Sequence, residues 1–169
     1  MQVLTLLALP DDLRQGAAIR LPRKIGNDKA AKRQLLFSEL TENQIAKIVV
    51  DAAYRIHKHF GPGLHETVYE VCLSYELKKC GLNVERQVAV KLHYDSIVFD
   101  EAFRADLIVE NKVILEIKAI EEMHRIHKKQ LLTYLRLSEM RLGLVINFDA
   151  EFIRDGIARV VNGLPEDQQ

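Results

Sequence analysis

The sequence predicts an α/β fold (α+β by its antiparallel strands), with a mixed four-stranded sheet flanked by helices. Two stretches of helical spacing come first, within residues 41–80. The spacing then changes to a period of two over residues 84–120, which is typical of strands. Another helical stretch and an apolar run follow, up to residue 148. From residue 64 the core order is therefore αβββαβ, with one extra helix before it.

Length and composition favour one globular domain. A chain of 169 residues can bury a real core, and 48% apolar with 28% charged residues is ordinary for a globular protein. No stretch reaches 18 apolar residues, so we expect no membrane span. Cys72 and Cys80 lie on one predicted helix and do not resemble a disulfide framework, so we expect a cytoplasmic protein. A net charge of zero argues against a protein that coats nucleic acid.

The first part of the chain differs from the rest. Residues 1–36 hold seven Lys or Arg and three Asp or Glu, and residues 10–34 show no clear periodicity. The apolar start, MQVLTLLALP, lacks the charged region and the cleavage site of a signal peptide. We expect residues 1–36 to be a poorly ordered extension, with a short hairpin or a basic arm as alternatives. The folded domain should span residues 37–163, and residues 164–169 should form a tail.

Two helices are expected before the sheet. A capping-box pattern at Thr41 and Gln44 opens the helical spacing of residues 41–60. The Gly-Pro-Gly sequence that follows should end this helix, because proline removes a backbone donor. The second helix is expected over residues 64–80, with Gly81 as a good terminator.

Three strands are expected next. Over residues 84–94 the apolar side chains take even positions, with Arg86 as the exception, which predicts a strand with one buried face. Turns are expected at Asp95-Ser96 and at residues 110–112, with the second strand between them. The third strand, residues 113–120 (VILEIKAI), is nearly all apolar, as expected for a strand covered on both faces.

The C-terminal part should add three elements. Residues 123–137 are expected to form a helix, and residues 142–148 (LGLVINF) a buried strand. A last helix is expected over residues 150–161, ending at Asn162-Gly163.

Charged side chains inside the third strand indicate a site, because buried charges are costly unless they are paired or bind a metal. Glu116 and Lys118 share one face of their strand, as Arg104 and Asp106 do on the preceding strand. Glu116 and Lys118 interrupt the otherwise apolar run of their strand.

The register of these two strands follows from the same parity. With a three-residue loop at 110–112, Leu107 opposes Leu115 on an apolar face. On the other face Asp106 then lies opposite Glu116, with Cβ atoms roughly 4.5–5.5 Å apart. A two-residue loop would mix polar and apolar side chains on both faces, so the pattern favours the odd loop or a bulge.

Two facing carboxylates repel each other, and without a counter-charge one should be protonated. A divalent cation resolves this, since Mg²⁺ takes carboxylate oxygens together with water and substrate phosphate. Lys118, one strand step away, could hold an attacking water or stabilise charge on a phosphate, as in metal-assisted phosphodiester hydrolysis. The alternative is an ordinary cross-strand charge cluster on a solvent-facing edge, since a bare Asp…Glu-x-Lys pattern is short and common.

A second motif precedes the sheet. Gly63, Glu66 and Tyr69 form G-x-x-E-x-x-Y at a helix start, where Glu66 and Tyr69 share a face. Taken alone, such an acid complements the helix dipole, and such a tyrosine is ordinary core. Together, GPGLHETVYE, FRADLIVENKVILEIKAIEEM and HKKQLLTYLRLSEMRLGLVINF resemble the GxxExxY proteins, a branch of the PD-(D/E)xK nuclease superfamily with a restriction-endonuclease-like fold. The resemblance covers about residues 37–163, and residues 1–36 lie outside it.

The resemblance implies a role for each matching residue. Asp106 would match the superfamily's acid on the second strand, and Glu116 with Lys118 its E-x-K. Glu66 would match the acid that many members carry on the first core helix, so the implied metal ligands are Glu66, Asp106 and Glu116. Ala105 stands where the superfamily's name has proline, at a position that varies widely.

Further candidates lie on the helix after the E-x-K strand. Gln130 and Tyr134 would match a Q-x-x-x-Y of some nuclease branches and share one face, where they could contact a phosphate or water of the metal site. The alternative is a solvated glutamine and a packed tyrosine. Lys128 and Lys129, with Arg104, are candidates for phosphate contacts.

We therefore expect a Mg²⁺- or Mn²⁺-dependent nuclease that acts on nucleic acid, with DNA favoured. The alternative is a catalytically silent nuclease-fold module that binds nucleic acid or a protein partner, since fold alone does not fix function. The intact acids and lysine favour the enzyme, and the neutral charge favours the alternative. A homodimer or an unidentified protein partner stays open. The six histidines form no zinc constellation, although His127 could face the site.

Overall fold

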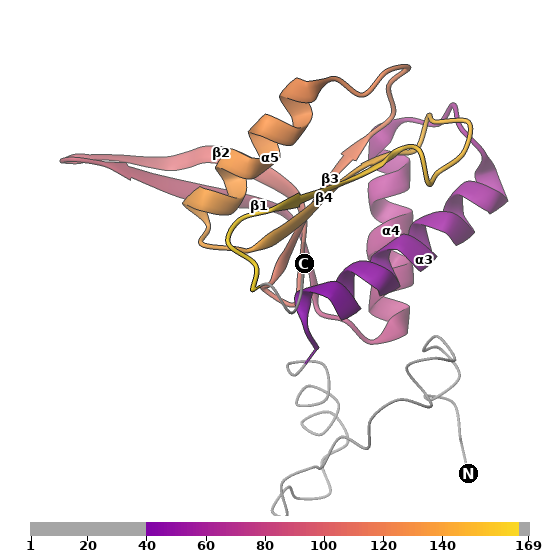
Figure 1. Cartoon of the computed structure of the whole chain (residues 1–169), viewed down its shortest axis with the longest axis horizontal. Coiled ribbons are helices and arrows are strands. Elements are labelled where there is room, and N and C mark those ends of the chain that lie inside the picture. Colours follow the sequence, from indigo (N-terminus) through magenta and orange to yellow (C-terminus); the bar gives the residue numbers. More distant parts are fainter. Residues whose placement is uncertain (1–39, 166–169) are drawn as a thin grey trace, which may run out of the picture.

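The structure, a computed structural model, describes residues 40–165, and the predicted extension at residues 1–36 lies outside this range. Helices cover both faces of a central sheet (Figure 1). The elements in chain order are α3 (Glu42–Phe60), α4 (Glu66–Cys80), β1 (Val84–Tyr94), β2 (Ile97–Val109), β3 (Val113–Lys118), α5 (Arg125–Leu137), β4 (Leu142–Asn147) and β5 (Ile157–Val161). The order predicted from residue 64 to residue 148 is therefore confirmed, and the packed part reaches at least to the buried Leu164.

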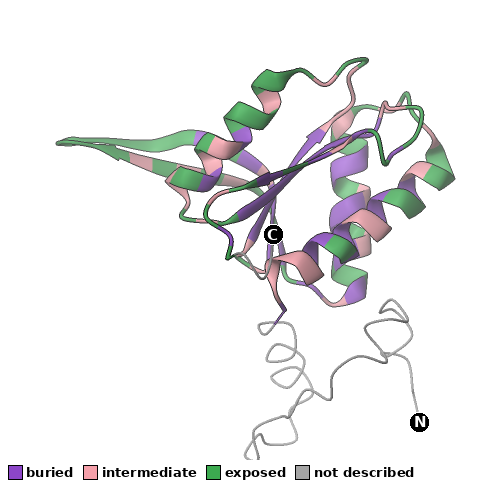
Figure 2. Cartoon of the chain, viewed as in Figure 1, coloured by how far each residue is buried: buried purple, intermediate pink, exposed green. Residues whose placement is uncertain are grey.

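The sheet has five strands in the order β1-β2-β3-β4-β5. Only β3 and β4 run parallel, so the sheet is mixed, as expected. Helices α3 and α4 pack on one face and α5 on the other, each over its own apolar cluster (Figure 1). Strands β3 and β4 are buried on both faces almost throughout (Figure 2), which agrees with their largely apolar sequences.

The predicted last helix over residues 150–161 is wrong. Residues 149–156 form turns, and β5 follows as a fifth strand antiparallel to β4. Ile153 and Ile157 are four apart, which imitated a helical face. Gly156 instead packs so closely that a Cβ atom there would lie 2.2 Å from the carbonyl oxygen of Asn147. This tertiary contact favours the strand over the helix, and the local sequence pattern does not indicate it.

The loop between β2 and β3 has the predicted length of three residues. Val109 faces Val113, and Leu107 faces Leu115. Glu110 and Asn111 both have φ near +52°, a left-handed pair that turns the chain. The antiparallel pairing stops at Leu107, so the expected direct pairing of Asp106 with Glu116 is not part of the register.

The hairpin of β1 and β2 continues far beyond the body of the sheet (Figures 1 and 2). We name its outer part, residues 91–102, the arm; all of its side chains except Leu92 are exposed. The predicted turn at Asp95-Ser96 forms its tip, where Tyr94 faces Ile97. The apolar face expected along β1 therefore holds only near the body of the sheet.

The ends of the first two helices follow the sequence signals. Thr41 caps α3 through a capping box, with reciprocal bonds to Gln44 of 2.8 and 3.3 Å. Gly81 ends α4 in a left-handed conformation. Cys72 and Cys80 are both free thiols, as expected. Among the described residues, no helix combines the length and the apolar character that a membrane crossing requires.

Candidate active site

Asp106 lies where β2 separates from β3, and both of its carboxylate oxygens accept hydrogen bonds. The backbone N–H of Ile117 donates to Oδ2 over 2.9 Å, at the point where the strand pairing has stopped. The side-chain amide of Gln87 on β1 donates to Oδ1 over 3.2 Å. The carboxylate is thus fixed from two strands, yet its side chain is only half-buried and stays open to a ligand.

Glu116 is the buried acid of the site, with 8% of its surface exposed. Its Oε2 lies 3.7 Å from the Nζ of Lys118, whereas its buried Oε1 has no hydrogen-bond partner within residues 40–165. Burial, reinforced by the nearby charge of Asp106, raises the pKa of Glu116 to about 8. A buried carboxylate with a free oxygen is the kind of group that a cation stabilises.

Lys118 bridges the end of β3 and the start of α4. Its Nζ donates to Glu66 Oε1 over 3.3 Å and to the carbonyl oxygen of Ile117 over 2.8 Å. Burial alone would lower the pKa of Lys118, but Glu66, Glu116 and Asp106 together outweigh it and raise the pKa. The ammonium is therefore held in its charged form among three carboxylates.

The G-x-x-E-x-x-Y motif builds the loop that places Glu66. Tyr69 is fully buried; its hydroxyl donates to the carbonyl oxygen of Gly61 (2.6 Å) and accepts from the N–H of Leu64 (3.2 Å). Gly63 has φ +96°, which a residue with a side chain rarely adopts, and its N–H donates to Asp149. Tyr69 thus stabilises the turn that precedes α4, and Glu66 is the first residue of that helix.

Three residues beside the site were not predicted as part of it. Glu70 on α4 is 3% exposed, and it accepts from Arg86 Nε and from Gln87 Nε2, each over 2.9 Å. Arg86 is the polar exception in the alternation of β1, and this buried partner explains it. Gln87 gives no sequence signal, because a glutamine at the polar parity of a strand is ordinary surface.

Gln130 and Tyr134 both lie on α5, and their side chains form a hydrogen bond with each other. The ring of Tyr134 stacks on Phe103 with centroids 3.8 Å apart, so the packed tyrosine of the alternative reading is also present. Burial, with the nearby charge of Glu116, raises the pKa of the Tyr134 hydroxyl. Gln130 is exposed, and its role in contacting substrate stays a prediction.

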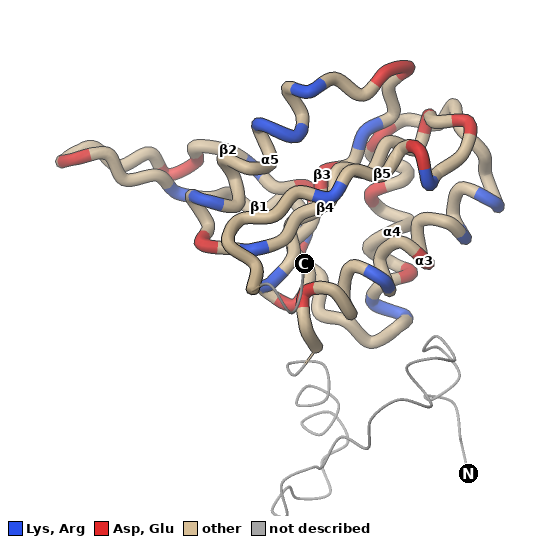
Figure 3. The backbone as a smooth tube through the Cα atoms, viewed as in Figure 1, with Lys and Arg blue, Asp and Glu red and all other residues tan. Residues whose placement is uncertain are grey.

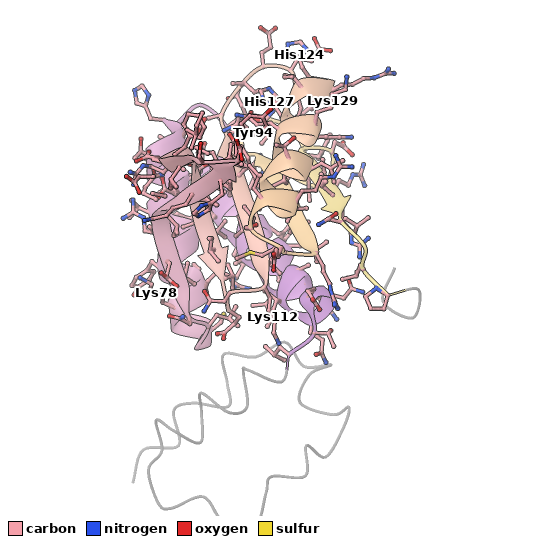
Figure 4. The ribbon with its side chains drawn as sticks, turned by 90° about the vertical axis from the view of Figure 1, so that its left-hand side faces the viewer. Lys78, Tyr94, Lys112, His124, His127 and Lys129 are labelled. Carbon is pink, nitrogen blue, oxygen red and sulfur yellow. The ribbon has the colours of Figure 1, made fainter. Side chains whose placement is uncertain are left out.

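Basic residues line α5, which carries four Lys or Arg and no acid (Figure 3). Lys128 and Lys129 are exposed, with Lys129 near the start of the helix (Figure 4). His127, labelled beside it, has a pKa lowered by burial and by the charge of Lys118. Arg104 pairs with Glu101, and its role as a phosphate contact stays a prediction.

The end of β3 is tied to the end of β4 by Asn147, which sequence reasoning left inside an apolar strand. Its side chain accepts from the N–H of Ile120 (3.0 Å) and donates to the carbonyl oxygen of Ile120 (2.7 Å). Asn147 is 3% exposed, and these bonds satisfy its buried amide. The bonds fix the segment that follows Lys118.

The donor set fits a hard divalent cation of the magnesium type. In the described part of the chain, no three His, Cys, Asp or Glu side chains are close enough to hold a metal by themselves. Mg²⁺ usually binds one or two carboxylates and keeps several waters, and Asp106 with the free oxygen of Glu116 is a donor set of that kind. Glu66 is engaged with Lys118 instead, and its predicted role as a metal ligand is not tested by this arrangement.

Comparison with known proteins agrees with this chemistry. The family model described as PD-(D/E)XK nuclease superfamily matches residues 43–160, a range that includes every candidate site residue. No significant match was found to a curated protein or to a solved structure.

Proposed function

Because the chain belongs to the PD-(D/E)XK nuclease superfamily, we propose that it is a Mg²⁺- or Mn²⁺-dependent nuclease that hydrolyses phosphodiester bonds, with DNA as its substrate. The observation that carries the proposal is the buried Glu116, whose Oε1 lacks a partner within residues 40–165, beside Asp106 and Lys118. We also assign the chain to the GxxExxY branch, because Gly63, Glu66 and Tyr69 together build the loop beside this site. The free thiols support a cytoplasmic location.

In the proposed reaction Asp106 and Glu116 hold the divalent ion. The ion supplies charge stabilisation at the scissile phosphate and a more acidic water. Asp106 is already oriented by two hydrogen bonds, which reduces the reorganisation that metal binding requires. Glu116 must release a proton on binding, because its pKa is raised to about 8 without a metal.

Lys118 acts as a charged donor in this scheme. Its raised pKa keeps the ammonium protonated, so it holds a water or stabilises charge on the phosphate and does not accept a proton. Gln130 and Tyr134 are proposed to contact the phosphate or water from the side of α5. The exposed Lys128 and Lys129 are proposed to contact phosphates along the substrate, which fixes its position without reading its sequence.

The first test compares metal binding by the wild type with binding by the Asp106→Ala/Glu116→Ala double variant. Calorimetry with Mg²⁺ and with Mn²⁺ should detect a site in the wild type that the double variant has lost. The matched control is Glu85→Ala/Asp100→Ala, which removes two exposed carboxylates from the same hairpin and should bind like the wild type. Cleavage of single- and double-stranded DNA is assayed on the same preparations.

Three outcomes separate the readings. Site-dependent binding with DNA cleavage supports the nuclease and begins to define its substrate. Binding without cleavage of DNA contradicts the proposed substrate and calls for RNA or a partner protein. Equal binding by all three proteins contradicts the metal site and leaves a nuclease fold that serves as a binding module.

A further inference from the structure

Gln87 adopts a backbone conformation that is unusual for its residue type. Its φ is +52°, in the left-handed region, although it lies within β1. Arg86 and Val88 on either side pair with Leu107 and Ala105, whereas Gln87 itself has no partner in the register. Residues other than glycine are strained in this region, and they keep such a conformation where their surroundings enforce it.

Two sets of contacts enforce this conformation. Arg104 donates from Nη1 to the carbonyl oxygen of Gln87 over 2.7 Å. The side-chain amide of Gln87 donates to Glu70 Oε2 over 2.9 Å and to Asp106 Oδ1 over 3.2 Å. The NH₂ group of the amide has two protons to donate, so it can serve both carboxyl groups at once.

Glu70 gives the amide a fixed support. It is buried, and its other oxygen accepts a hydrogen bond from Arg86 Nε over 2.9 Å, which holds the side chain in place. Gln87 therefore lies between an immobile carboxylate on α4 and the half-buried carboxylate of Asp106 on β2. An amide donor at this position orients Asp106 without adding a positive charge, which would compete with a cation for the same carboxylate.

We infer that Gln87 is a positioning residue that holds Asp106 in the orientation required for metal binding, with Glu70 as its anchor. The inference rests on the proposed function, because the orientation of Asp106 matters only if Asp106 binds a metal. The inference also explains the strained backbone at Gln87. The left-handed conformation directs the amide toward two carboxylates, whereas a regular strand conformation would leave it facing solvent.

The test exploits the backbone conformation of Gln87. Glycine adopts φ +52° without strain, so Gln87→Gly removes the amide while relieving the backbone. Gln87→Leu keeps the strain and approximate size but removes both hydrogen bonds. The matched control is Ala89→Gly, which introduces a glycine at another exposed position of β1. Mn²⁺ affinity is measured by calorimetry on the full chain, and the melting temperature is measured without metal.

We expect both Gln87 variants to bind Mn²⁺ about 10- to 100-fold more weakly than the wild type, the usual effect of losing such a supporting contact. The melting temperature of Gln87→Gly should equal or exceed that of the wild type, and Ala89→Gly should keep wild-type affinity. Unchanged affinity in both Gln87 variants overturns the inference while the proposed function stands. An affinity loss only alongside a lowered melting temperature in both also overturns it, because the role is then structural. A wild type without site-dependent Mn²⁺ binding overturns the inference and the proposed function together.

Discussion

Glu116 shows at the scale of one residue how a functional site departs from the needs of stability. A carboxyl group with 8% of its surface exposed and one oxygen without a partner in the described structure is destabilising when ionised. An apolar side chain would suit this interior position better, as Ile114, two residues earlier on the same face of β3, illustrates. The presence of an acid at this buried position is explained if a bound cation requires its charged form.

This burial predicts a pH dependence of stability in the metal-free protein. The pKa of Glu116 is about 8 when folded, against the ordinary 4.5, so the folded state binds more protons than the unfolded state between these values. The stabilising contribution of Glu116 to the free energy of unfolding is therefore fully present below about pH 4.5 and is lost as the pH rises through about 8. Urea unfolding in the presence of a chelator, at pH 6 and pH 9, should show this loss.

The variant Glu116→Gln isolates this effect from the other titrating groups. Its amide cannot ionise, so its free energy of unfolding should fall less between pH 6 and pH 9 than that of the wild type. Parallel pH dependences for the two proteins would show that Glu116 titrates near its ordinary pKa and is not the buried acid described above.

At the scale of elements, the loop before α4 depends on the hydroxyl of Tyr69. That hydroxyl satisfies one carbonyl and one N–H of the loop, and the ring stacks on Phe148 with centroids 4.4 Å apart. Tyr69→Phe keeps the ring and removes both hydrogen bonds, which leaves two backbone groups unpaired. We expect a loss of about 1–3 kcal/mol in the free energy of unfolding, measured by urea titration.

The matched control for this prediction is Tyr75→Phe on the same helix. Tyr75 is 65% exposed, so loss of its hydroxyl should change the free energy of unfolding by no more than about 0.5 kcal/mol. Equal stabilities of Tyr69→Phe and the wild type would mean that the loop does not need the tyrosine hydroxyl.

The elements also show what the sequence could and could not predict. The parity of Asp106 and Glu116 along two strands predicted the three-residue loop and the face on which both acids lie, because side-chain alternation is local information. The separation of the strands at Asp106 was not predictable, since it depends on the hydrogen bond from Ile117. The strand β5 was missed for a similar reason: the close packing of Gly156 is tertiary.

The candidate site divides in the same way. Asp106, Glu116 and Lys118 stand out because charges interrupt apolar runs. Gln87 and Glu70 could not be found, because a polar residue on a strand or helix is ordinary until its partner is known. Their contacts join positions 16 to 19 residues apart, which no periodicity encodes.

At the scale of the whole molecule, the buried core of the described structure spans residues 40–164. Leu40 is buried at one end and Leu164 at the other. We therefore expect deletion of residues 1–34 to leave the melting temperature nearly unchanged, as measured by a thermal melt.

Deletion of residues 1–40 provides the comparison for this prediction. It also removes the side chain of Leu40 and the carbonyl oxygen that accepts from Lys112 Nζ over 2.7 Å, so it should lower the melting temperature. A large decrease already on deletion of residues 1–34 would show that the extension packs on the domain.

The arm has a consequence for the motions of the site. Between residues 97 and 106, β2 is paired with β1 alone, so its outer hydrogen bonds can open without disturbing β3. Amide exchange should thus be fast at the tip and slow near Leu107, because opening free energies follow local packing. Phe103, which stacks on Tyr134, lies between the fast-exchanging tip and the slow-exchanging part of β2, three residues before Asp106. We therefore expect a single strand to have a fast-exchanging tip and, at its other end, an acid held by hydrogen bonds from two neighbouring strands.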